Sequence, residues 1–176
     1  MDPQILDYNI RPVQISDAET IARIYNYYIV NTVITFEEEE VSSDEISNRI
    51  REIVEADLPW LVIEHKGSLT GYAYASKWKS RCSYRFSVEL GIYLDHFATG
   101  KGMGSALYKA LLEKVESLGH HVAIGGVALP NPASETLHVK VGMKQVAKFE
   151  AVGFKFGKWI DVAYYQKTFG ETDDGS

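Results

Sequence analysis

Cysteine, positive charge and long apolar runs are all scarce in this sequence of 176 residues. The one cysteine, Cys82, has no partner for an internal disulfide, which excludes a disulfide-stapled scaffold. Lys and Arg number 18 against 24 Asp and Glu, and the net charge of -6 argues against a nucleic-acid partner. No apolar run reaches the roughly 20 residues of a membrane helix, and MDPQILDYN lacks the basic start and apolar core of a secretory signal. We therefore expect a cytoplasmic protein that binds neither nucleic acid nor a membrane.

Internal repeats, linkers and metal-ligand spacings are missing as well. The length and a hydrophobic content of 45% suit one domain over residues 1–170. Residues 171–176 are acidic and contain no apolar side chain, so we expect a disordered tail there. No histidine is spaced with Cys82 as in a zinc site, and the adjacent His120 and His121 would face opposite sides of a strand. The sequence predicts no metal site.

Apolar periodicity and capping residues together predict an α+β fold. Strands are expected over residues 9–14, 60–65, 69–78, 84–94, 121–129, 143–149 and 159–169. Helices are expected after the caps Ser16 and Ser42, after a glycine-rich stretch, and after the pair Asn131-Pro132. The segment 32–41, with its four glutamates, is either a solvated loop or a loop that flanks a pocket. These elements suit a mostly antiparallel sheet with helices on its faces.

The glycine-rich stretch, ATGKGMGSAL, places Gly100, Gly102 and Gly104 directly before a helix, where unpaired N–H groups attract anions. A P-loop is excluded because that motif has Ser or Thr directly after its Gly-Lys pair, whereas here Gly102 follows Gly100-Lys101. A dinucleotide fingerprint is weak because Ser105 stands where the third glycine belongs. From the residues alone, the stretch is either a flexible turn or an anion-binding helix start.

Glu89 is the one carboxylate in the apolar strand that precedes these glycines. Strand alternation places it on the same face as Ser87, Gly91 and Tyr93. It is either an exposed residue of a half-solvated sheet or a partly desolvated base, whose pKa burial raises. Together with the helix starts at the glycines and at Asn131, it suggests a single cleft.

These motifs carry a resemblance to a known family. Thr99-Gly100-Lys101-Gly102-Met103-Gly104 fills the frame Q/R-x-x-G-x-G/A, which wraps the CoA pyrophosphate in the GNAT superfamily of acyl-CoA N-acetyltransferases. Thr99 departs from the usual Gln or Arg. The chain is most similar to phosphinothricin and methionine sulfoximine N-acetyltransferases, through TFE, YASKWKSRCSYRFSVE, LPNPASETLH and VGFKFGKWIDVAYYQ. The resemblance implies the GNAT fold, a mostly antiparallel mixed sheet flanked by helices, with acetyl-CoA as co-substrate and a homodimer as assembly.

The resemblance also implies roles along the strand that contains Glu89. The corresponding glutamate is the proposed general base, acting directly or through water, because the acceptor amine has to lose a proton before it attacks. The segment Gly91-Ile92-Tyr93 pairs with the pantetheine arm of CoA, and one of its main-chain N–H groups polarises the thioester carbonyl. Without the resemblance, Gly91 suits a β-bulge equally well.

Further roles fall near the second helix start and before the strand. His138 stands seven residues after Asn131, where many GNAT members have tyrosine, and either protonates the departing thiolate, binds a substrate oxyanion or simply packs on its helix. Asn131 caps the helix and, by resemblance, donates to the pantetheine or phosphate arm. Arg81 and Tyr84 match positions that bind the acceptor, and are otherwise a solvated turn residue and a sheet aromatic.

The function implied is transfer of acetyl from acetyl-CoA to the α-amine of a small amino-acid analogue, of the phosphinothricin, methionine sulfoximine or methionine sulfone type, by direct attack in a ternary complex. Two alternatives stay open. One is acetylation of a different amine, such as a polyamine, an aminoglycoside or a protein N-terminus. The other is a non-catalytic acyl-CoA-binding sensor, against which Glu89 and His138 argue.

Overall fold

The computed structural model describes residues 7–170, so the expected tail over residues 171–176 lies outside the described part of the chain. Within that part, one mixed sheet has the strand order β1-β2-β3-β4-β5-β7-β6. An antiparallel meander is formed by β1 (Tyr8–Pro12), β2 (Trp60–His65), β3 (Ser68–Lys77) and β4 (Ser87–Leu94). The sheet continues with β5 (Val122–Ala128), parallel to β4, and with the antiparallel hairpin of β6 (Lys144–Lys155) and β7 (Lys158–Thr168).

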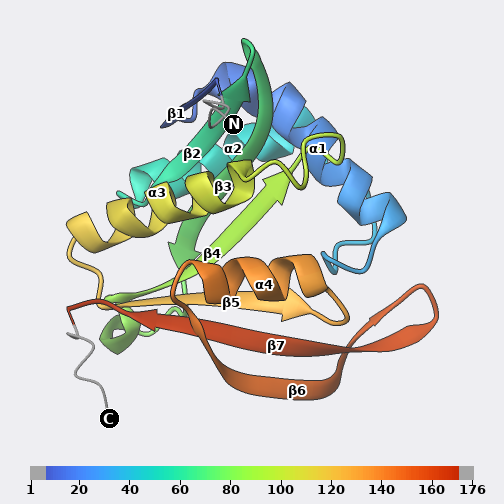
Figure 1. Cartoon of the computed structure of the whole chain (residues 1–176), viewed down its shortest axis with the longest axis vertical. Helices are drawn as coiled ribbons and strands as arrows, with labels where there is room; N and C mark the ends of the chain where they lie inside the picture. The colour runs from blue at the N-terminus through green and yellow to red at the C-terminus, as the bar shows by residue number, and fades with distance from the viewer. Residues whose placement is uncertain (1–6, 171–176) are drawn as a thin grey trace, which may run out of the picture.

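The helices cover both faces of this sheet (Figure 1). α1 (Ala18–Asn31) and α2 (Ser43–Glu55) pack on one face of the meander, and α3 (Met103–Ser117) packs on the other. α4 (Pro132–Lys140) lies beside β5 and contacts α3. The predicted α+β architecture, with a mostly antiparallel mixed sheet, is confirmed.

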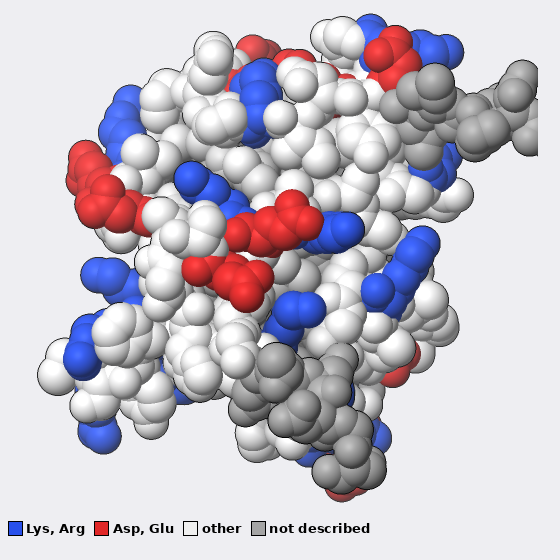
Figure 2. Space-filling view, turned by 60° about the vertical axis from the view of Figure 1, so that its left-hand side comes forward, with Lys and Arg blue, Asp and Glu red and all other residues white. Residues whose placement is uncertain are grey.

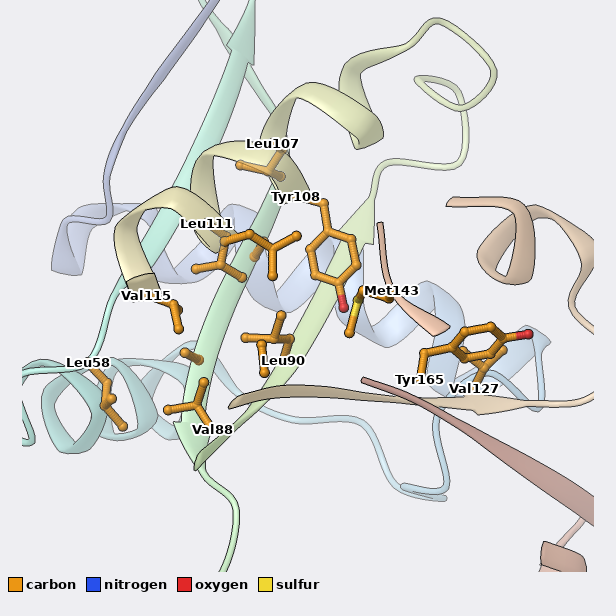
Figure 3. Close-up of a cluster of buried hydrophobic side chains, with 14 of the residues drawn as sticks. Leu58, Val88, Leu90, Leu107, Tyr108, Leu111, Val115, Val127, Met143 and Tyr165 are labelled. Carbon is orange, nitrogen blue, oxygen red and sulfur yellow. The ribbon is translucent and has the colours of Figure 1, made fainter. Parts of the chain in front are cut away.

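Strand alternation divides the apolar side chains into two layers. Ile63 and Ala73 pack toward α3, in the cluster that also contains Leu111 and is drawn in Figure 3. Their sequence neighbours Val62 and Tyr72 pack toward α1 and α2. Because successive residues face opposite sides, a slip of one residue in β3 would exchange the side chains that meet α3 with those that meet α1 and α2, and neither layer would then fit its helices.

Capping of the first two helices is only partly as predicted. Ser42 caps α2, since its hydroxyl accepts a hydrogen bond from the N–H of Glu45 at 3.1 Å. The prediction that Ser16 caps the first helix is wrong, because a 3-10 turn precedes α1 and the Asp17 carboxylate accepts the N–H of Gln14 at 2.7 Å. Arg11 holds that carboxylate with two hydrogen bonds of 2.8 and 2.9 Å. The start of α1 therefore depends on this turn, in which Asp17 binds Gln14 and Arg11, and not on the hydroxyl of Ser16.

The surface carries charges of both signs. On the face in Figure 2, acidic and basic side chains lie close to one another, with apolar and neutral surface between them. None of the helices formed by residues 7–170 is long and apolar enough to cross a membrane.

Candidate active site

The sheet opens between its two halves (Figure 1). β4 and β5 pair in parallel as far as Leu90 and Gly125, where the pairing ends. Beyond this point β4 is paired only with β3, and β5 is paired only with β7. Each strand therefore presents a free backbone edge to the gap, with N–H and C=O groups available for a ligand.

A cavity of about 290 Å³ lies at this opening. It brings together six of the residues predicted from the sequence: Glu89, Gly91, Ile92, Tyr93, Asn131 and His138. The rest of its wall is formed by Ile34, Tyr74, Ser76, Leu90, Tyr108, Gly126, Val127, Ala128 and Ser134. Ile34 belongs to the segment 32–41, which was expected to be either a solvated loop or a loop that flanks a pocket. The structure shows that it flanks a pocket.

Glu89 is the single carboxylate among the residues that line this cavity. Its neighbour Val88 is buried in the core toward α3, so the predicted alternation along β4 is confirmed. Burial raises the pKa of Glu89 above its usual value, and the positive charge of Lys79 lowers it in part. A half-buried carboxylate of raised pKa, facing a cavity, is suited to take a proton from a bound amine near neutral pH.

His138 also lines the cavity and is 3% exposed. Its Nδ1 lies 2.7 Å from the carbonyl oxygen of Ser134, and its Nε2 lies 3.0 Å from the hydroxyl of Tyr108. A carbonyl oxygen only accepts, so Nδ1 carries the hydrogen and Nε2 accepts the hydroxyl hydrogen of Tyr108. Burial lowers the pKa of His138, and the hydrogen bond with Ser134 raises it in part, so the ring is neutral near pH 7.

Gly125 on β5 makes room for this pair. A Cβ at this position would collide with the imidazole of His138 and would lie 2.9 Å from the Tyr108 hydroxyl oxygen. Tyr108 of α3 can therefore reach His138 of α4 across β5 only because Gly125 has no side chain.

Gly91 is small for a related reason. β3 and β4 pair without a register shift, so Gly91 does not lie in a bulge, and the ring of Tyr74 on β3 folds over it. A Cβ at Gly91 would lie 2.7 Å from the nearest atoms of that ring. The missing side chain at Gly91 thus makes room for the ring of Tyr74, and both residues line the cavity.

The glycine-rich loop has the conformation of an anion-binding helix start. Gly100 and Gly102 have φ values of +77° and +78°, in the left-handed region that favours glycine. Gly102 is the N-cap residue of α3, and no side chain caps the first turn. A Cβ at Gly100 would meet nothing within 4 Å, so the loop is open on that side. The free N–H groups of α3 are accessible to an anion.

The side chains of this loop differ in what they offer a ligand. Thr99 and Lys101 each donate to a backbone carbonyl earlier in the loop, at 3.3 Å, and the exposed ammonium of Lys101 keeps two further N–H donors. Met103 is 1% exposed and packs in the core, which leaves only its backbone for a ligand. A Cβ at Gly104 would lie 3.2 Å from the side chain of Leu94, so this glycine allows α3 to pack closely on β4. The loop thus presents main-chain N–H groups and the side chain of Lys101.

The remaining predicted residues differ in their placement. Asn131 caps α4, with its Oδ1 accepting the N–H of Ser134 at 3.2 Å, and it also lines the cavity. Arg81 and Tyr84 do not line the cavity, and both are exposed. Tyr84 ends a 3-10 turn rather than beginning the strand predicted from residue 84, because β4 starts only at Ser87.

Sequence reasoning missed Tyr74, Tyr108 and Ser134. Tyr108 lies in the helical period that also buries Leu107 and Leu111, so the pattern indicates a core aromatic. The available signal was its hydroxyl, because a buried phenol usually has a hydrogen-bond partner. Within residues 7–170, no group of three or more His, Cys, Asp and Glu side chains is arranged to hold a metal ion.

The fold and this cavity correspond to a known class of enzyme. The model of the acetyltransferase (GNAT) domain matches residues 10–164, so the chain belongs to the GNAT acetyltransferases and is an acetyl-CoA-dependent N-acetyltransferase. A phosphinothricin N-acetyltransferase of Streptomyces viridochromogenes is 33% identical, over 96% of this chain and 92% of the relative. An L-methionine sulfoximine/L-methionine sulfone acetyltransferase of Salmonella typhimurium is 33% identical, over 92% of this chain and 95% of the relative. The crystal structure of a phosphinothricin acetyltransferase from Sinorhizobium meliloti in complex with acetyl-CoA matches with a TM-score of 0.90 and 34% identity, over 97% of this chain and 92% of that chain.

The residues on this chain fit acetyl-CoA, which supplies the activated acetyl group in this class. The uncapped N–H groups of α3 beside Gly100 and Gly102 suit a pyrophosphate. The free edges of β4 and β5 beyond Leu90 and Gly125 suit the amides of a pantetheine arm. An acidic protein can hold this anionic molecule because backbone dipoles supply donors beside the side chain of Lys101.

Proposed function

We propose that the protein transfers acetyl from acetyl-CoA to the α-amine of a small amino-acid analogue, of the phosphinothricin, methionine sulfoximine or methionine sulfone type, by direct attack in a ternary complex. The observation that carries the proposal is Glu89, the single carboxylate that lines the cavity, with a pKa raised by burial. The acceptor class comes from the names of the relatives from Streptomyces viridochromogenes and Salmonella typhimurium.

In this proposal, each group in the cavity has one task. Glu89 takes a proton from the acceptor, directly or through water, and the backbone N–H groups around Ile92 stabilise the charge that develops on the thioester oxygen. The hydroxyl of Tyr108, which His138 Nε2 holds in place, gives its proton to the departing thiolate and regains one from solvent when the products leave. No cysteine lines the cavity, and Cys82 is exposed, which favours direct attack over an acyl-enzyme.

Glu89→Gln tests the base. Glutamine keeps the size of the side chain but accepts no proton, so we expect a normal fold and a loss of roughly 10²-fold or more in kcat at neutral pH. Release of free thiol from acetyl-CoA measures the turnover, and thermal unfolding checks the fold. Turnover equal to that of the wild type would refute the role of Glu89.

An amine panel separates the proposed acceptor from the alternatives. Phosphinothricin, methionine sulfoximine and methionine sulfone are assayed beside a polyamine, an aminoglycoside and an N-terminal peptide. We expect turnover with the first three only. Turnover confined to the others would assign a different acceptor, and binding of acetyl-CoA without turnover on any amine would assign a sensor.

Arg81 and Tyr84 are proposed as ligands of the polar end of the acceptor. The support is their place in the segment that joins β3 to β4, next to Lys79, whose charge reaches Glu89. Arg81→Gln should raise the KM for the acceptor and leave kcat nearly unchanged, because it removes binding that ground state and transition state share. An unchanged KM would show that Arg81 is only a solvated turn residue.

A homodimer is proposed as the assembly. β6 is an edge strand, and the hairpin of β6 and β7 exposes large apolar side chains, with Trp159 69% exposed and Phe149 51% exposed. An apolar edge of this kind is usually covered. Sedimentation of the wild type should give twice the mass of the chain, and Phe149→Asp should shift it toward the monomer. A wild-type monomer at micromolar concentration would contradict the proposal.

A further inference from the structure

Two segments that carried the family resemblance, TFE at residues 35–37 and VGFKFGKW at residues 152–159, meet in the fold. The Nζ of Lys155 donates to the carbonyl oxygen of Thr35 at 2.8 Å, across 120 positions of the chain. Beside this bond, the ring of Phe36 packs directly against Gly153, where any Cβ would collide with it. The active-site chemistry described above uses neither segment.

Lys155 is unusual because it is 1% exposed. Among residues 7–170, its ammonium group has one hydrogen-bond acceptor, the Thr35 carbonyl, and it lies 5.0 Å from the ring centre of Phe156. Glu37 and Glu38 are its nearest acidic neighbours, and burial lowers the pKa of Lys155 while these two carboxylates raise it in part. Burying a cation costs free energy that one carbonyl only partly offsets, so the residue does not serve packing alone.

The inner side of the same loop is fixed as well. The hydroxyl of Tyr25 on α1 shares a hydrogen bond of 2.7 Å with Thr35 Oγ1 and donates to Glu37 at 2.8 Å. Arg49 on α2 donates to both oxygens of Glu37, at 2.7 and 3.1 Å. Loop 32–41 is therefore held between the two helices on one side and the hairpin of β6 and β7 on the other.

One residue of this loop reaches the cavity. Ile34 lines it together with Glu89, Tyr108 and His138. The acceptor amine has to come close to Glu89 in the proposed reaction, so a displacement of Ile34 changes the space that the acceptor enters.

We propose that Lys155 is a positioning residue that determines acceptor specificity: by anchoring Thr35, with Phe36 seated on Gly153, it fixes the wall around Ile34 at a distance that admits small amino acids. The inference rests on the proposed function, because it concerns the acceptor of that reaction. Lys155 acts through the loop and contacts no reacting atom. A displacement of about 1 Å in such a wall is enough to change turnover by up to about 10²-fold.

Lys155→Met tests the anchor, because methionine keeps the length of the stem and removes the donor. We expect the KM for the small acceptor to rise about tenfold, the KM for acetyl-CoA to stay within about twofold, and the ratio of turnover with bulkier amines to turnover with small ones to increase. Lys158→Met is the matched control, since Lys158 is an exposed lysine of the same hairpin. It should leave all three quantities unchanged.

Gly153→Ala removes the seat of the Phe36 ring, and so weakens the hold on the loop by a second route that keeps Lys155 intact. It should reproduce the change in acceptor KM, and hydrogen exchange should increase in residues 32–41 of both variants, with or without substrates. Equal acceptor KM and equal exchange in Lys155→Met and Lys158→Met would overturn the proposal, as would an equal rise in both KM values, which indicates general destabilisation. Failure of the wild type on every amine would refute the proposed function instead, and the exchange measurement would still decide whether Lys155 anchors the loop.

Discussion

Gly125→Ala is the sharpest test of the cavity wall that Tyr108 and His138 build. The added methyl group would collide with the imidazole of His138 and lie 2.9 Å from the Tyr108 hydroxyl oxygen, closer than carbon and oxygen approach without a bond. Both side chains are held by their surroundings, since Tyr108 and His138 are 0% and 3% exposed. The strain therefore cannot be released by turning a side chain into solvent, and we expect the hydrogen bond between them to break.

The magnitude follows from overpacking. Forcing one methyl group into a closely packed site costs about 1–3 kcal/mol, and loss of a buried hydrogen bond adds about 1 kcal/mol. For a domain of this size, each kcal/mol lowers Tm by about 2–4 °C, so Gly125→Ala, with a total cost of about 2–4 kcal/mol, should lower Tm by about 4–16 °C. Turnover should fall as well, because His138 leaves its position.

Gly126→Ala is the matched control for stability. It makes the same exchange one residue further along β5, but a Cβ there would lie 3.4 Å from the nearest atom of Tyr164, an ordinary contact. Thermal unfolding of both variants at the same pH gives the comparison. An equal Tm for Gly125→Ala and Gly126→Ala would refute the argument that Tyr108 and His138 require a glycine beneath them.

The other predictions concern charge. Lys79→Met removes the positive charge that lowers the pKa of Glu89, so the acid limb of the pH profile of kcat should move to higher pH. If a pH titration of turnover finds this limb unmoved, the limb does not report the ionisation of Glu89. Thr99→Arg should tighten CoA binding by up to about fivefold if a cation at this position reaches the pyrophosphate, and calorimetry that finds equal or weaker binding would show that a cation at this position adds nothing to the donors of the loop. The hydrogen bond from Arg11 lowers the pKa of Asp17, so this pair stabilises the fold above the usual aspartate pKa of about 3.9 and ceases to do so as pH falls through the lower folded-state value. Arg11→Met should accordingly cost more free energy of unfolding at pH 7 than in strong acid, and an equal cost in denaturant titrations at both pH values would contradict the assignment.

Local features were predictable because the sequence contains all their parts. Ser42 and Asn131 cap their helices as predicted, since the side-chain acceptor and the N–H that it binds lie three residues apart. The alternation around Glu89 was predictable because a strand turns successive residues to opposite faces. The left-handed glycines before α3 follow from the same kind of local rule.

Contacts between distant segments were decided only by the tertiary structure. Ser16 has the spacing of a cap, yet a 3-10 turn precedes α1, and in it the Asp17 carboxylate accepts the N–H of Gln14 and pairs with Arg11. Arg81 and Tyr84 were expected near the acceptor from the resemblance, and the 3-10 turn before β4 leaves both exposed outside the lining of the cavity. Periodicity assigns a residue to a face of an element but does not say which other element will meet that face.

The α+β class, the helix start that suits a pyrophosphate and the carboxylate on the strand before it can all be read from the order of the residues. The contact of Tyr108 with His138 over Gly125, and that of Lys155 with Thr35 across 120 positions, become visible only in the folded chain. The difference arises because a cap or a strand face is defined by the backbone geometry of a few neighbouring residues. A cavity wall is defined by side chains from separate elements, whose meeting depends on how the whole sheet and its helices pack.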